Sequence, residues 1–206
     1  MNKLAGLAIL TLLGGASALS AQDTEAGKAS FATCAACHGA NAEGNKALNA
    51  PALAGQEAWY LERQLSNFKA GVRGTGSDAF GAQMAPMAAM LATDADIKNV
   101  AAFIAALSPA SITHDGGGDA AAGQALYGTC AACHGVQAEG NAALNAPTLV
   151  LQQDWYIVRQ LENFKSGARG AHADDAFGAQ MRPMAMMLAD AAAMKNVAAY
   201  IASLGN

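Results

Sequence analysis

The chain has few charged and few aromatic residues, and this scarcity already excludes several kinds of protein. Charged residues make up 14% of the 206 positions and aromatic residues 6%, while the formal net charge is −4. Without an excess of basic residues, the chain lacks the charged face that binds nucleic acid, so no nucleic-acid partner is expected. The hydrophobic fraction of 53%, largely alanine, excludes a disordered tail, and the composition is equally unlike that of a coiled coil.

Only one long uncharged apolar run occurs in the sequence, and it lies at the N-terminus. It follows Lys3 and ends in small residues, reading LAGLAILTLLGGASALSA. This pattern is typical of a secretory signal peptide, so we expect residues 1–21 to be removed, with cleavage between Ala18 and Ala21. A membrane anchor is disfavoured because the strongly apolar part, residues 4–13, is too short for a bilayer core of roughly 30 Å. We therefore expect an exported protein with no transmembrane segment after cleavage.

The rest of the sequence is a tandem duplication. ATCAACHG at 32–39 recurs as GTCAACHG at 128–135, and RQLSNFKAGVRG from Arg63 recurs as RQLENFKSGARG from Arg159. Copies of about 85–90 residues have the size of small domains and are too long for solenoid units. Proline and a glycine triplet break regular structure between them. The predicted division is a signal peptide at 1–21, an N-terminal domain at 22–107, a linker at 108–118 and a C-terminal domain at 119–206.

Apolar residues recur at helical spacing within each copy. Asp23 is placed to cap a helix that runs into the first cysteine. A second helix is predicted over 57–69, with Gly71 as its terminator. A third helix is predicted to begin at Thr93, with Asp96 three residues on as the partner in a capping box. No alternating β-type run of useful length appears, so the predicted fold class is all-α.

The four cysteines form two copies of one short motif. Each motif reads CAACH, and the two consist of Cys34, Cys37 and His38 and of Cys130, Cys133 and His134. Two thiols three positions apart can add to the two vinyl groups of one porphyrin, and the next histidine then reaches the iron. Two alternatives are disfavoured. A redox-active CxxC disulfide needs no such histidine, and a zinc ribbon has its CxxC pairs about 15–20 residues apart, whereas the two pairs here are 96 residues apart. The motifs therefore predict two covalently bound haem c groups, with His38 and His134 as iron ligands.

The methionines late in each copy are the candidates for the opposite face of the iron. They are Met84, Met87, Met90, Met181, Met184, Met186 and Met187. Methionines at such spacing are usually core residues, and most of these are expected to be so. Proline suits a first helical turn and forces the residue before it to be extended, so Pro86 predicts that Met87 lies on a short helix and Met84 in the preceding loop. In the second copy Met181 is selected in the same way, with Met87 and Met184 as the alternative ligands.

These features resemble those of the dihaem cytochrome c4 family, two class I cytochrome c domains in tandem. The resemblance covers 22–206 and depends on both CAACH motifs, NAPALAGQ at 49–56, the helix ending in FKAG and the late methionines. It implies cytochrome c-like domains, each wrapped around one haem. It also implies that the carbonyls of Pro51 and Pro147 accept a hydrogen bond from the haem-ligating histidine. The second copy departs from the pattern with APTLVLQ at 146–152, which predicts a haem pocket of different shape or polarity.

Haem also carries two propionate carboxylates, for which each copy offers candidate donors. They are Trp59, Trp155, Arg63, Arg73, Arg159 and Arg169. The alternative for each tryptophan is an ordinary core position, and the alternative for each arginine is solvation. His172, in a loop with one inserted residue, is disfavoured as a substitute for Met181 because the methionine recurs in register and the histidine does not.

Two irons closed on both faces by protein ligands leave no position for a substrate, so we expect electron transfer and not catalysis. The resemblance implies a periplasmic carrier of single electrons. Its expected partners are a quinol-oxidising membrane complex or a dehydrogenase as donor and a terminal oxidase as acceptor, bound by transient docking. Two alternatives stay open. One is a cytochrome subunit held permanently in a larger dehydrogenase, and the other is a dihaem peroxidase, which the near-identity of the two methionine loops disfavours.

Overall fold

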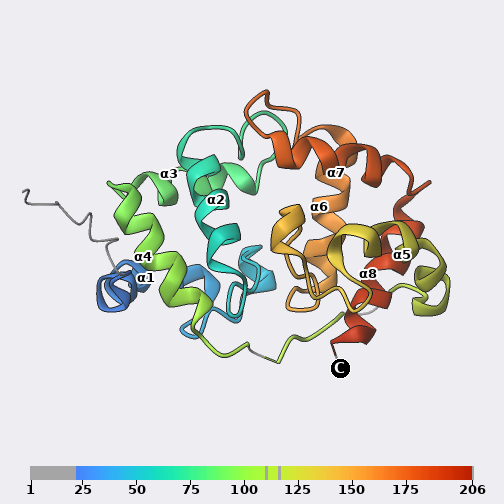
Figure 1. The fold of residues 1–206 in the computed structure, drawn as a ribbon, viewed down its shortest axis with the longest axis horizontal. Helices are drawn as coiled ribbons and strands as arrows, with labels where there is room; N and C mark the ends of the chain where they lie inside the picture. The colour runs from blue at the N-terminus through green and yellow to red at the C-terminus, as the bar shows by residue number, and fades with distance from the viewer. Residues whose placement is uncertain (1–21, 110, 116, 206) are drawn as a thin grey trace, which may run out of the picture.

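The computed structural model describes residues 22–109, 111–115 and 117–205, which form two lobes of helices (Figure 1). The predicted signal peptide at 1–21 lies outside the described residues. The N-terminal domain contains α1 (Thr24–His38), the 3₁₀ helix η1 (Lys46–Leu48), α2 (Ala58–Lys69), α3 (Gly81–Ala89) and α4 (Asp94–Ala105). The C-terminal domain contains α5 (Ala120–His134), η2 (Ala142–Leu144), α6 (Asp154–Ser166), α7 (Ala176–Met186) and α8 (Ala191–Leu204). Within the described ranges, β structure is limited to two isolated bridges, which confirms the all-α prediction.

The helix ends follow the capping that the sequence predicts. The Asp23 side chain accepts hydrogen bonds from two amides in the first turn of α1, and Asp119 does the same for α5. Thr93 and Asp96 form a complete capping box at the start of α4. Helix α2 is followed by Gly71 with φ 72°, a left-handed conformation that favours glycine. Local sequence therefore sets these boundaries.

The helix that carries the methionines begins earlier than predicted. Helix α3 begins at Gly81, so Pro86 lies inside it and not in its first turn. The buried carboxylate of Asp78 accepts a hydrogen bond from the amide of Gly81 at 2.9 Å, which stabilises a helix start well before the proline. The prediction that Met84 lies in a loop is therefore wrong, because it lies on α3. Met181 lies on α7 in the same way.

Each domain has its own hydrophobic core. In the N-terminal domain α1 packs against α4, and α2 packs against both α3 and α4. In the C-terminal domain α5 packs against α8, and α6 packs against α7 and α8. The two cores contain equivalent side chains, such as Val100 in the first and Val197 in the second, each 1% exposed. The duplication in sequence is thus a duplication in packing.

Helices α1 and α4 approach each other closely at Gly27. A Cβ atom there would lie 2.1 Å from the backbone carbonyl oxygen of Asn99 on α4. This oxygen is part of the helix backbone, so it cannot move away unless the helix moves with it. Gly27→Ala is therefore expected to lower the free energy of unfolding by about 1–3 kcal/mol, measured by denaturant titration. The matched control is Gly128→Ala on α5, where a Cβ meets nothing within 4 Å. That variant should be as stable as the parent or up to about 1 kcal/mol more stable. Equal destabilisation by both changes would contradict the close approach.

The two domains face each other through α2 and α6 and the loops before them, while the linker runs along one edge of the molecule (Figure 1). Gln56 Nε2 donates to the carbonyl of Thr148 at 3.1 Å. Gln152, its equivalent in the second copy, donates to the carbonyl of Ala52 at 3.1 Å. Gln153 also crosses the boundary, accepting from the amide of Ala52 at 2.9 Å. Equivalent side chains reaching across in both directions give the boundary approximate twofold symmetry.

Candidate cofactor sites

Each domain contains a cavity next to its CAACH motif. The cavity volume is about 360 Å³ in the N-terminal domain and about 170 Å³ in the C-terminal domain. Both volumes exceed the ~150 Å³ that holds a benzene molecule. The N-terminal cavity is lined in part by Cys34, Cys37, His38, Met84 and Met87, and the C-terminal cavity by Cys130, Cys133, His134, Met181 and Met184. The fold therefore brings the predicted thiols, histidine and methionines of each copy to one place.

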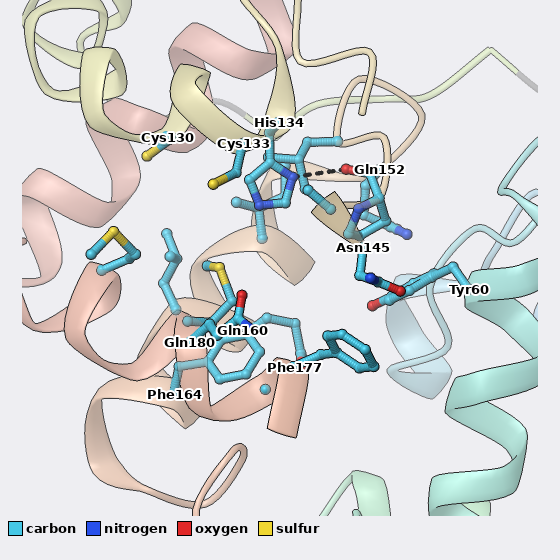
Figure 2. Close-up of a pocket in the computed structure, with 18 of the residues that line it drawn as sticks. Tyr60, Cys130, Cys133, His134, Asn145, Gln152, Gln160, Phe164, Phe177 and Gln180 are labelled. Atoms are coloured by element: carbon cyan, nitrogen blue, oxygen red, sulfur yellow. Dashed lines mark hydrogen bonds between the residues drawn. The ribbon is translucent and has the colours of Figure 1, made fainter. Parts of the chain in front are cut away.

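The two histidines end α1 and α5, and the ring of His134 points into its cavity (Figure 2). Gly39, next after His38, has φ 84° and ψ 156°, a conformation that glycine permits, and the chain turns away there. Nδ1 of His38 lies 2.8 Å from the carbonyl oxygen of Pro51, and Nδ1 of His134 lies 2.8 Å from that of Pro147. A carbonyl has no proton to donate, so Nδ1 carries the hydrogen and Nε2 keeps a lone pair for a metal. The hydrogen bonds implied by the family resemblance are confirmed.

Burial holds both imidazoles in the form that binds metal. His38 is 4% exposed and His134 is 6% exposed. Desolvation lowers the pKa of each ring below its ordinary value, and the hydrogen bond to the prolyl carbonyl opposes this shift without reversing it. The rings are therefore neutral at neutral pH, and no proton has to leave before a metal binds.

The cysteine thiols lie on the last turns of α1 and α5, three residues apart. Within the described residues none of the four cysteines forms a disulfide; Cys34 and Cys130 are half-buried, and Cys37 and Cys133 are exposed. Burial raises the pKa of Cys34 and of Cys130. In Figure 2 the sulfur atoms of Cys130 and Cys133 lie along one side of the cavity, and Tyr60 of the other domain lies on the opposite side. A flat ligand bound by both thiols thus has its far edge toward the domain boundary.

The methionine candidates lie one turn apart on the same helix. Met84 and Met87 both line the N-terminal cavity, as Met181 and Met184 line the C-terminal cavity. Met181 packs against the core of its domain, whereas Met184 is 37% exposed. This burial favours Met181 as the inward-facing residue. His172 is exposed, with Nδ1 3.7 Å from the carboxylate of Asp174.

Each cavity is also closed by the opposite domain, which the sequence analysis missed. The C-terminal cavity is lined by Gln56, Tyr60, Arg63 and Gln64, and the N-terminal cavity by the equivalent Gln152, Tyr156, Arg159 and Gln160. The available indication was that these polar side chains recur 96 residues apart, on α2 and α6 and just before each helix.

Comparison with known proteins agrees with this geometry. The family model for cytochrome c matches residues 24–108 and 120–205. Cytochrome c4 of Azotobacter vinelandii is 34% identical, over 85% of this chain and 88% of its own. The crystal structure of reduced cytochrome c4 from Pseudomonas stutzeri matches with a TM-score of 0.68 at 29% identity, covering 88% of this chain and 98% of that one. The chain belongs to the cytochrome c4 family. A thiosulfate dehydrogenase electron acceptor of Stutzerimonas stutzeri (strain A1501) is also 34% identical, over 98% of this chain and 94% of its own.

As a member of this family, the protein is a dihaem electron carrier with two covalently bound haem c groups. Two buried arginines at the boundary fit the carboxylates of that cofactor. Arg73 is 5% exposed and Arg169 is 7% exposed, and the Nε atom of each is buried without a protein partner. Arg73 Nη2 donates to Tyr156 Oη and Gln160 Oε1, both at 2.9 Å, and Arg169 Nη2 donates to Tyr60 Oη at 3.1 Å. Because an unpaired buried donor is costly, a propionate is a suitable acceptor, and solvation of these two arginines is the wrong alternative.

The two sites of the protein differ where the second copy departs from the family pattern. Thr148 replaces the equivalent Ala52 and lines the C-terminal cavity, with Oγ1 donating to the carbonyl of Ala138 at 3.2 Å. Leu151 replaces Gly55 and lies beside that glycine, in the contact between the domains. Thr148 therefore changes the polarity of one cavity wall, as the sequence predicts, while Leu151 changes the packing of the boundary, which was not predicted.

Proposed function

We propose that each haem c of this chain is attached to one CAACH motif and that its iron is ligated from both faces by the same domain. The attaching residues are Cys34 and Cys37 in the N-terminal domain and Cys130 and Cys133 in the C-terminal domain, and the ligand pairs are His38 with Met84 and His134 with Met181. The observation that carries the proposal is the histidine Nδ1, held by a prolyl carbonyl at 2.8 Å inside a cavity that two thiols and a methionine also line.

The residues of each cavity set the chemistry of electron transfer. Haem supplies a one-electron iron couple. The histidine presents a neutral, oriented nitrogen, and the methionine presents a neutral thioether, a ligand pair that raises the reduction potential. If one histidine and one methionine of the chain both bind the iron, no position would be left for an exogenous substrate.

We propose further that the exported chain, after removal of 1–21, consists of domains at 22–107 and 119–206 joined by the linker 108–118, and that it works in the periplasm. Its electron donor is a quinol-oxidising membrane complex or a dehydrogenase, and its acceptor is a terminal oxidase. The similarity to thiosulfate dehydrogenase electron acceptors of two organisms supports the dehydrogenase as donor. Among the residues that the structure describes, no helix is long and apolar enough to cross a membrane.

The second candidate function is that of a cytochrome subunit held in a larger dehydrogenase, and the same similarity to dehydrogenase-linked proteins favours it. The two candidates differ in how the native protein migrates. We expect periplasmic extract to give the haem-containing chain as a lone species in size-exclusion chromatography, because a transient carrier must be released quickly. Elution in a fixed complex with a flavoprotein would favour the subunit.

Optical redox titration of the purified protein tests the carrier function directly. We expect two one-electron transitions, a low-spin ferric spectrum and no turnover of hydrogen peroxide, because both axial positions of each iron are filled. A high-spin ferric band together with peroxide turnover would contradict the carrier function and would support a dihaem peroxidase instead.

A further inference from the structure

Arg63 belongs to α2 of the N-terminal domain, but its charge lies at the wall of the C-terminal cavity. Its Nη1 and Nη2 donate to the side-chain and main-chain oxygens of Asn145, both at 3.0 Å. Its guanidinium carbon lies 4.5 Å from the ring centre of Phe177 and 4.8 Å from that of Trp59. Asn145, Phe177 and Arg63 all line the C-terminal cavity. Three of these contacts, two to Asn145 and one to Phe177, hold the cation at the site of the other domain, while Trp59 supports it from its own helix.

Arg159, the equivalent residue on α6, makes the reciprocal contacts. Its Nη2 donates to Asn49 Oδ1 at 2.7 Å, and its guanidinium carbon lies 4.0 Å from the ring centre of Phe80. All three residues line the N-terminal cavity, and Nη1 of Arg159 is buried without a protein partner. Each cavity thus contains one arginine of its own domain, Arg73 or Arg169, and one arginine supplied by the opposite domain.

Each crossing arginine contacts the side of its cavity that lies away from the thiols, where the propionate edge of an attached haem would lie. The vinyl and propionate groups occupy opposite edges of a porphyrin, and the thiols that bind the vinyl edge lie on the far side of the cavity from the boundary. Figure 2 shows this for the C-terminal site, where Asn145, Phe177 and Tyr60 lie on the side opposite Cys130 and Cys133. Arg63 contacts two of these boundary residues, Asn145 and Phe177.

We propose that the reduction potential of each haem is set in part by an arginine of the opposite domain, by Arg63 for the C-terminal haem and by Arg159 for the N-terminal haem. The inference rests on the proposed function and deepens it. A fixed cation favours the reduced iron, because reduction removes one positive charge from the haem. Half-burial against aromatic rings reduces screening by salt relative to a fully exposed side chain. Neither arginine binds iron. Each places a fixed positive charge near the haem that the opposite domain holds.

Arg63→Gln tests the crossed assignment. We expect the C-terminal haem to become harder to reduce relative to the N-terminal haem, shifting the equilibrium distribution of one electron between them by about tenfold, or ~59 mV for a one-electron couple. Arg159→Gln should shift the distribution in the opposite direction. Potentiometric titration followed by the shifted haem-methyl resonances of the ferric protein resolves the two haems. The resonances that change most in the Met84→Ala variant, in which both haems stay attached, identify the N-terminal haem.

Two controls separate charge from damage to the boundary. Arg63→Lys keeps the cation and should leave the electron distribution near that of the parent. Lys98→Gln removes an exposed cation from α4 and should change the distribution less than Arg63→Gln does. A shift of the haem in the arginine's own domain, an equal shift of both haems, or no shift would overturn the crossed assignment alone. A parent protein without two one-electron transitions would overturn the proposed function and this inference together.

Discussion

Replacing Cys34 and Cys37 together by alanine is expected to halve the covalently bound haem and to unfold the N-terminal domain. Without its cofactor, that domain retains a cavity of about 360 Å³, walled by core residues such as Leu61, Val100 and Ile104. Large internal cavities destabilise a domain in proportion to their volume, and a domain of about 85 residues has little stability to lose. Haem per chain, measured by the pyridine haemochrome assay, should fall from two to one, and the far-UV circular dichroism should lose about half of its helical signal.

The matched control for this variant is Cys130→Ala/Cys133→Ala. It should produce the mirror result, with haem retained in the N-terminal domain. Limited proteolysis distinguishes the two variants, because each should be cut in the domain that has lost its haem. Two full haem groups in either variant would contradict attachment through the CAACH motifs.

Met84→Ala is expected to remove about half of the weak near-infrared iron–sulfur band of the ferric protein and to lower the reduction potential of the N-terminal haem. The thioether favours ferrous iron, so its loss favours the ferric form. Met181→Ala should remove the other half of the band. The ferric absorption spectrum and the redox titration measure both effects.

Met87→Ala is the control for the ligand assignment, because Met87 lines the same cavity one turn further along α3. We expect this variant to keep the full band and to lose only packing. A band that survives Met84→Ala but is halved in Met87→Ala would transfer the ligand role to Met87.

Local patterns were sufficient to predict the helices whose ends are set by nearby side chains. Asp23 and Thr93 each cap a helix through hydrogen bonds to residues no more than three positions away, so the local sequence is enough to predict these helix starts. The cofactor motif is equally local, because its two cysteines and histidine lie within about one helical turn. Even the contact of His38 with Pro51, which spans 13 residues, followed from the family resemblance.

The start of α3 was not predictable by the rule that places proline in the first turn. That rule considers only the residue before Pro86 and the turn that contains it. In the structure the decisive group is the Asp78 carboxylate, eight positions earlier, which satisfies the amide of Gly81 while buried. Because Met84 and Met87 both lie on α3, the choice of Met84 as ligand depends on which of the two side chains faces the cavity.

The boundary between the domains was hidden for a different reason. Arginine is usually a surface residue, but Arg73 and Arg169 are buried at the boundary, where each also donates to side chains of the opposite domain. No spacing within one copy encodes that contact. What the sequence did contain was the repetition of arginine, tyrosine and glutamine at equivalent positions of α2 and α6, where solvated side chains have no reason to be repeated.

The intact mass of the mature protein, measured under denaturing conditions, tests the central claim that both cavities hold covalently attached haem. The account predicts one species whose mass equals the processed chain plus two haem groups, with both thiols of each CAACH motif consumed. A red protein that releases its haem on denaturation, or a chain with the mass of its amino acids alone, would contradict it.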